Sequence, residues 1–182
     1  MEYTIENQYL KVSVITYGAQ LSSVVRKSDN VEHMWQADPD VWGYHAPILF
    51  PHAGRVLDNT IEAKGGTYTS GQHGFARLME HKLVYCNDTE VALELVSSPE
   101  TLEKWPYEFR LLSTFTLEGD TLHHKLTVEN HDGEKMPFGI GYHPAFALPF
   151  DDNHDSSTDY ELRFDKIESP ICLKTPGGLV SG

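Results

Sequence analysis

Hydrophobic residues that recur at every second position are the feature of this sequence that most limits its possible folds. The longest such run spans 109–117 and places five residues on one face: Phe109, Leu111, Ser113, Phe115 and Leu117. Because successive side chains of a β-strand point to opposite faces, this alternation is typical of a strand with one buried face. The same pattern recurs in three other segments: 10–14, 91–95 and 122–128.

Short turn-forming links separate these runs, such as Glu118-Gly119-Asp120 and Cys86-Asn87-Asp88. Helix signals are weak: a short stretch at 98–105, where Ser98 fits an N-cap and Pro99 the first helical position, and a possible further turn at 38–42. Strands that follow one another without long helices favour an antiparallel sheet over a parallel α/β fold. We therefore predict an all-β protein built as a large antiparallel β-sandwich.

The charge of the chain excludes several classes of partner. Its 182 residues carry 14 Lys and Arg against 27 Asp and Glu, a net charge of −13 with histidine neutral. Nucleic acids and anionic membranes need a basic surface, so we expect neither as a partner. The first residues lack the charged and apolar regions of a signal peptide, and no apolar stretch is long enough to span a membrane. We expect a cytoplasmic protein with a small-molecule partner.

The cysteines and histidines give little indication of a metal site or a disulfide framework. Cys86 and Cys172 stand in no metal-ligand spacing and are too few for a disulfide framework. His123 and His124 are adjacent on a predicted strand, so they point to opposite faces and cannot hold one metal. His45 and His52 also match no metal spacing, and four histidines with polar neighbours are predicted to be surface residues: His33, His81, His131 and His154. We expect no metal and no other cofactor.

Three segments have the composition of a functional site. The first, FPHAGR at 50–55, runs from an apolar strand through proline and glycine to Arg55. The second, QHGFAR at 72–77, sets His73 beside a glycine, which lets the backbone and a ligand approach closely. In the third, PFGIGYHPAF at 137–146, two glycines interrupt an apolar strand just before His143. A surface turn is the alternative for the first two segments, and a buried structural histidine is the alternative for the third.

In this order, the FPHAGR, HGFAR and GYHPAF segments resemble those of the aldose 1-epimerase superfamily, and most closely its LacX-like branch. The resemblance covers essentially the whole chain. It implies the galactose mutarotase-like β-sandwich, with residues 1–182 forming one domain that is truncated at its C-terminus. It also implies a sugar site centred on His73 and His143.

The family's reaction interconverts the α and β anomers of a hexose by opening and closing its ring. A base takes the proton of the C1 hydroxyl while an acid protonates the ring oxygen, a role that suits histidine near neutral pH. The resemblance implies that His143 is the catalytic acid and that His73 is the second catalytic histidine. It implies that Arg55 binds sugar hydroxyls, and that Arg77 supports the site or binds an anionic group of the substrate.

The sequence departs from the family pattern in two ways. The family's catalytic glutamate and a sugar-binding aspartate come from a later part of a longer chain, and Glu161 and Glu168 lack the context to replace them. His52 stands where an apolar residue is more usual. We therefore expect this chain alone to have little epimerase activity.

Three alternatives to a free-hexose epimerase stay open. A hexose-6-phosphate 1-epimerase shares an HGFAR-like motif, and Arg77 would then contact the phosphate. A sugar-binding relative without turnover would keep the cleft but lack the base. A cupin-like metal enzyme is also all-β, but it predicts a paired HxH motif that the sequence lacks.

Overall fold

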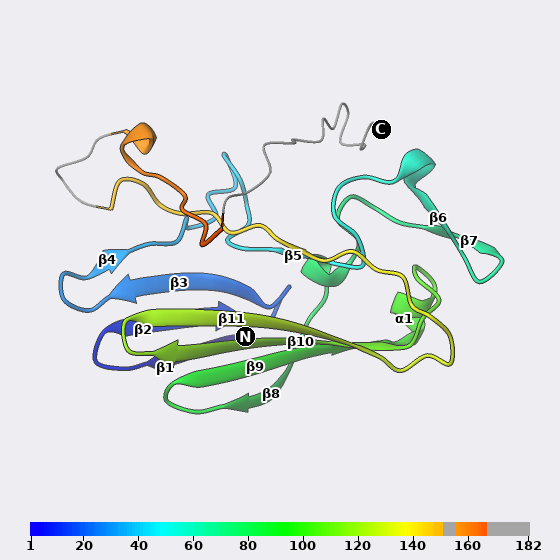
Figure 1. Cartoon of the computed structure of the whole chain (residues 1–182), viewed down its shortest axis with the longest axis horizontal. Coiled ribbons are helices and arrows are strands. Elements are labelled where there is room, and N and C mark those ends of the chain that lie inside the picture. The colour runs from blue at the N-terminus through cyan, green and yellow to red at the C-terminus, as the bar shows by residue number, and fades with distance from the viewer. Residues whose placement is uncertain (151–155, 167–182) are drawn as a thin grey trace.

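The computed structural model describes residues 1–150 and 156–166, and two four-stranded sheets form its framework (Figure 1). The first sheet has the order β1-β2-β3-β4, with β1 (Glu2–Glu6), β2 (Leu10–Ile15), β3 (Gln20–Arg26) and β4 (Val31–Glu32). The second has the order β11-β10-β9-β8, with β8 (Lys82–Cys86), β9 (Glu90–Val96), β10 (Phe109–Glu118) and β11 (Thr121–Asn130). All these strand pairings are antiparallel, which confirms the predicted fold class.

Smaller elements lie beside the two sheets. Two further strand pairs are β5 (Ile48–Leu49) with β12 (Gly141–Tyr142), and β6 (Thr60–Ala63) with β7 (Gly66–Thr69). The helical turns are α1 (Pro99–Leu102), η1 (Leu57–Asn59), η2 (Ala76–Leu78) and η3 (Ser157–Asp159). In Figure 1 the β6–β7 hairpin stands at one end of the molecule, above α1.

The hydrophobic core lies between the two four-stranded sheets. Along β10 every second residue is buried, from Phe109 to Leu117, as the alternation predicts. These residues share one apolar cluster with Val12 and Val14 of β2, so the two sheets pack face to face. Burial of apolar side chains on the facing sides of two sheets is the main source of stability in a sandwich.

The predicted helix near residue 99 is present but shorter than expected. It begins after Ser98, whose hydroxyl accepts a hydrogen bond from the Thr101 backbone N–H (3.4 Å). The Thr101 hydroxyl lies 2.8 Å from the Ser98 backbone N–H, which completes a capping box. The α-helix ends at Leu102, and the buried ring of Trp105 then anchors the chain in the core.

The predictions for the other histidines have mixed outcomes. His123 is exposed and His124 packs inward, so the adjacent pair does point to opposite faces, and His131 is exposed as predicted. The prediction that His81 is a surface residue was wrong: it is 2% exposed, and its Nε2 lies 3.0 Å from the Ala76 carbonyl oxygen. His81 holds a turn against the core even though its neighbours in the sequence are polar. The polarity of the neighbouring residues is therefore a poor guide to its burial. His33 is half-buried, and His154 lies outside the described residues.

Two further findings concern the surface. Cys86 is an exposed free thiol on β8, whereas Cys172 lies outside the described residues. Among the helices in the described ranges, none is long and apolar enough to cross a membrane.

Candidate functional site

The short strand β5 brings the three motif segments together. Its antiparallel partner is β12, with Gly141 opposite Leu49 and Tyr142 opposite Ile48. Phe50, directly after β5, forms a parallel bridge with Gly74. The second and third motifs therefore lie on opposite sides of the first motif, although about 70 positions separate them in the sequence.

Gly74 is required for this close approach. Its φ is +67°, and a Cβ at this position would lie 2.2 Å from the Phe50 carbonyl oxygen. That same oxygen accepts hydrogen bonds from the backbone N–H groups of Phe75 (3.0 Å) and Ala76 (3.2 Å). Glycine is the residue whose backbone can pass so near another chain segment, so it fixes the distance between the first two motifs.

His73 is held by two hydrogen bonds to Gly54. Its backbone N–H donates to the Gly54 carbonyl oxygen (2.8 Å), and its Nδ1 accepts from the Gly54 backbone N–H (2.9 Å). Because Nδ1 accepts, the neutral imidazole carries its proton on Nε2. That nitrogen lies 3.1 Å from the side-chain amide nitrogen of Gln72; because Nε2–H is a donor, the amide pairs with it only through its oxygen, after the amide group is turned over. Burial, followed by the positive charge of Arg77, lowers the pKa of His73 below its ordinary value, which favours this neutral form.

His143 approaches from the other side of β5. It directly follows β12, and its backbone N–H donates to the Pro47 carbonyl oxygen (3.1 Å). Its ring is exposed and lies 5.1 Å from the Trp42 ring, centroid to centroid. The Trp42 ring also contacts Tyr44 at 5.7 Å. These contacts place the imidazole at the end of a short aromatic wall.

Arg77 comes from η2 and packs on the same wall. Its guanidinium lies 5.0 Å from the centre of the Tyr44 ring, within the range of a cation–π contact. Its Nη2 donates a long hydrogen bond of 3.3 Å to the Gln72 carbonyl oxygen. Its Nε is buried and has no hydrogen-bond partner in the part of the chain that the structure describes. The guanidinium therefore keeps donor capacity for an acceptor outside these contacts.

These residues surround one open hollow of about 400 Å³. Its lining comprises Trp42, Tyr44, Pro47, Leu49, Gln72, His73, Arg77 and His143. Three of the four site residues predicted from sequence thus meet in one place, whereas Arg55 is exposed and is not among the lining residues. Among these lining residues there is no carboxylate. The hollow combines two imidazoles, one guanidinium and an aromatic wall, which suits a small polar ligand with an apolar face.

Sequence reasoning missed the aromatic wall. Trp42 was predicted only as part of a possible turn over 38–42, and that turn is present, with the Trp42 backbone N–H donating to the Asp38 carbonyl oxygen (2.7 Å). Tyr44 was not singled out. The two aromatic residues stand two positions apart just before the apolar run into β5, but that spacing alone does not distinguish a ligand wall from ordinary packing.

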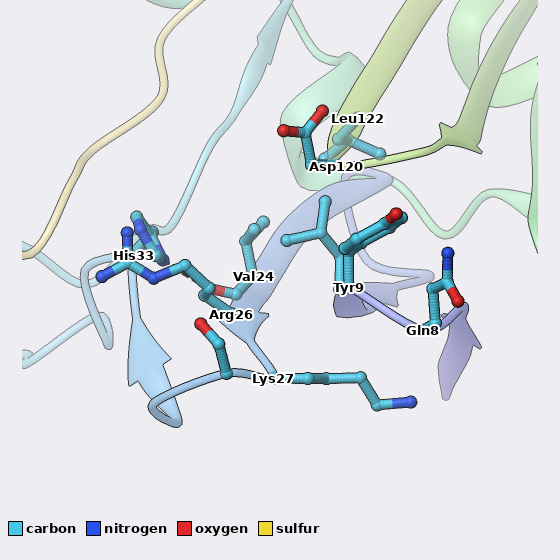
Figure 2. A pocket seen from close by; sticks show the side chains of 10 residues that line it. Gln8, Tyr9, Val24, Arg26, Lys27, His33, Asp120 and Leu122 are labelled. Carbon is cyan, nitrogen blue, oxygen red and sulfur yellow. Dashed lines mark hydrogen bonds between the residues drawn. The ribbon is translucent and has the colours of Figure 1, made fainter.

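A larger hollow, of about 600 Å³, lies elsewhere and offers less chemistry (Figure 2). It opens between β3 and the turn that leads into β11, with Val24 and Leu122 on its walls. Its cations have carboxylate partners: Arg26 pairs with Asp29 at 2.6 Å, and Lys27 Nζ lies 3.2 Å from a Glu6 oxygen. Charged groups that neutralise each other have little left for a ligand, so the hollow with the two histidines is the candidate site. Within 1–150 and 156–166, no three metal-binding side chains gather in one place.

Comparison with known proteins identifies the class to which this fold and site belong. The family model for aldose 1-epimerase matches residues 1–173, so the chain belongs to that family. The LacX protein encoded on a plasmid of Lactococcus lactis subsp. lactis is 36% identical over 175 residues, which are 93% of this chain and 58% of that protein. This relationship confirms the LacX-like branch. The chain therefore spans a little over half the length of that relative.

Solved structures agree with this assignment. A galactose mutarotase related enzyme from Lactobacillus acidophilus is 38% identical, with a TM-score of 0.82 over 85% of this chain and 52% of that one. A galactose mutarotase-like protein from Lactobacillus casei is 37% identical, with a TM-score of 0.79 over 84% of this chain and 52% of that one. The described strands thus follow the arrangement of about half of each neighbour.

Proposed function

We propose that this chain contributes the acid side of an aldose 1-epimerase site, which interconverts the α and β anomers of a free hexose. The observation that carries the proposal is the meeting of His73 and His143 in one hollow, in a chain that belongs to the aldose 1-epimerase family. Histidine is the side chain that most often acts as a general acid, as ring opening requires, and in this proposal His143 has that role.

In the proposed reaction, His143 protonates the ring oxygen while a base removes the proton of the C1 hydroxyl. The bond between C1 and the ring oxygen breaks, and an open-chain aldehyde forms. Rotation about the bond between C1 and C2 exposes the other face of the aldehyde, and the reverse steps close the ring as the opposite anomer. His143 suits the acid role because its imidazole is exposed at the hollow and its backbone is fixed beside β5.

His73 has a complementary role in this scheme. With Nδ1 occupied by the Gly54 N–H, its Nε2–H is available to donate to a sugar oxygen that carries partial negative charge during ring opening. Burial keeps the ring neutral, so it donates without the cost of a buried charge. Trp42 then supplies an aromatic surface for the apolar face of the pyranose ring.

The base must come from outside the residues that line the hollow, because none of those is a carboxylate. Family resemblance assigns it to a glutamate from a later part of longer relatives. We therefore propose that sugar turnover needs a second half of the sandwich, whereas weak sugar binding does not.

The experiment is polarimetry on freshly dissolved α-glucose or α-galactose. It compares this chain with a chimera in which the C-terminal part of the Lactococcus LacX protein follows it. The chimera is expected to accelerate mutarotation, and the chain alone to be at least about 100-fold slower, because a positioned base contributes roughly 10²–10⁴ in rate. His143→Ala in the chimera should lose activity to a similar degree, whereas the exposed His123→Ala should not. Equal activity of chain and chimera would contradict this assignment of the base.

One observation favours a second candidate, a hexose-6-phosphate epimerase. Arg77 lines the hollow, and no carboxylate among the lining residues neutralises its charge. Phosphate oxygens are strong acceptors for such a group. Two results would favour this candidate over the free hexose. The chimera would be more active on the hexose 6-phosphate, and Arg77→Gln would lower activity on the 6-phosphate more than on the free hexose.

A further inference from the structure

His52 does not line the hollow of the candidate site but a neighbouring one. It belongs to the FPHAGR segment, and its Nε2 lies 2.6 Å from the hydroxyl oxygen of Ser70. Ser70 follows β7, is 4% exposed, and donates its backbone N–H to the Asn59 carbonyl oxygen (2.8 Å). This bond between the residues that flank the β6–β7 hairpin fixes the backbone of Ser70, from which the hydroxyl reaches His52.

The His52 ring is poised to be neutral. Its Nδ1 is buried and lacks a hydrogen-bond partner among the described residues, so a proton there would be buried and unpaired. Burial lowers the pKa of this imidazole below its ordinary value. Through its contact with Ser70, the neutral His52 ring connects the β6–β7 hairpin to the segment 52–54.

Two residues further along, Gly54 makes both hydrogen bonds to His73. Its carbonyl oxygen accepts from the His73 backbone, and its N–H donates to His73 Nδ1. Gly54 has a φ of +78°, a backbone conformation that few residue types other than glycine adopt, and this turn sets the orientation of its peptide plane. A small rotation of this turn would remove the N–H from Nδ1, and the His73 proton would then be free to occupy either nitrogen.

We propose that His52 is a positioning residue for His73. Its contact with Ser70 holds the 52–54 turn in place, and the turn keeps the Gly54 N–H on His73 Nδ1. The His73 proton therefore stays on Nε2, the nitrogen next to Gln72 in the lining of the hollow. The consequence for sugar chemistry rests on the proposed function, but the link from Ser70 to the His73 tautomer does not.

The link matters because a hydrogen-bond donor must be present before the substrate arrives. A histidine that divides its proton between two nitrogens offers a donor to the substrate only part of the time.

The test is nitrogen NMR of ¹⁵N-histidine-labelled protein, without sugar, at a pH well above the histidine pKa values. In the native chain, His73 should show one protonated and one bare ring nitrogen, with Nε2 protonated. In Ser70→Ala and in His52→Leu, the two nitrogen shifts of His73 should move toward each other, as for a mixture of tautomers. His52→Gln should restore the native pattern, because its side-chain amide can reach Ser70.

Thr69→Ala, an exposed neighbour of Ser70, is the matched control and should leave the His73 signals unchanged. The signal of His124, which stacks on the buried ring of Phe115, reports whether each variant is folded. Native His73 tautomer signals in folded Ser70→Ala and His52→Leu would overturn the proposal. Because no substrate is present, this result is independent of whether the chimera epimerises sugars.

Discussion

At the scale of single residues, Gly74 shows why the site depends on one missing side chain. Its positive φ and its approach to Phe50 let the second motif lie directly beside the first. The sequence pointed to a close approach at this glycine, since a histidine beside a glycine suggested contact between backbone and ligand. The actual neighbour of Gly74 is the protein's own backbone, and only the tertiary structure reveals that.

We expect Gly74→Ala to destabilise the fold by well over about 1 kcal/mol, because it adds both backbone strain and a clash with the Phe50 carbonyl. Gly65→Ala is the matched control: its φ is also positive (+73°), but a Cβ there would meet nothing within 4 Å. Urea unfolding of both variants separates the two costs. Equal destabilisation would mean that the close approach at Gly74 contributes nothing.

Trp42 provides a second test at this scale. If its ring faces the sugar, Trp42→Ala should weaken binding of methyl pyranosides by about tenfold, or about 1.4 kcal/mol. Trp42→Phe should bind more tightly than Trp42→Ala, because a smaller aromatic face remains. Val41→Ala is the control, since Val41 is 73% exposed beside it. Isothermal titration with methyl glycosides, which cannot open their rings, measures binding without turnover; unchanged affinity in Trp42→Ala would remove Trp42 from the proposed wall.

At the scale of elements, long alternating segments were predictable and very short strands were not. Ten residues of β10 display their period clearly, so its buried face followed from the sequence alone. β5 and β12 contain two residues each, which is too short for any period to show. Their position is set by pairing between segments about 90 residues apart, and that pairing is what joins the motifs.

The helix α1 is an element whose start could be predicted from local chemistry, and it gives a direct test. Ser98→Ala removes the side-chain acceptor of the capping box, so the free energy of unfolding should fall by about 1 kcal/mol. Ser97→Ala is the matched control, because the Ser97 backbone, and not its side chain, bonds to Phe109. Equal values for the two variants in urea unfolding would show that the cap does not contribute to stability.

At the scale of the whole molecule, a half-buried histidine should make the sandwich sensitive to acid. His124 stacks on Phe115 at 4.1 Å, and its Nε2 lies 2.8 Å from the Ser113 hydroxyl oxygen. Burial lowers its pKa from 6.5 to about 4. Between pH 6.5 and about 4 the unfolded chain binds more protons than the folded chain, which lowers the free energy of unfolding. The full stability is therefore present above pH 6.5 and is lost as the pH falls toward about 4.

The resulting loss of stability between pH 7 and pH 4 should be about 3 kcal/mol from His124 alone. The double variant His124→Phe with Ser113→Ala keeps an aromatic ring and leaves no unpaired hydroxyl, so its stability should depend less on pH by about that amount. His123→Gln, on the opposite face, should behave like the native chain. An unchanged pH dependence in the double variant would show that another group causes the acid sensitivity.

Also at this scale, the fold class was predictable from the sequence, and three of the four residues proposed for the site lie around one hollow. The second and third motifs contain His73, Arg77 and His143, and these three residues line one hollow in the structure. Arg55 belongs to the first motif and does not line the hollow; it directly follows Gly54, whose backbone N–H is directed to His73. Motif order reveals which segments meet, whereas side-chain direction depends on backbone angles that the residue types do not specify.

The central claim is that the hollow between His73 and His143 binds an aldose, and histidine NMR during a sugar titration tests it most directly. Adding glucose or galactose to the ¹⁵N-histidine-labelled chain should shift the imidazole signals of His73 and His143 along one saturable curve. The signals of the exposed His123 and His131 should stay in place. Shifts confined to His123 and His131, or no shift in any histidine at saturating sugar, would contradict the assignment of this hollow as the sugar site.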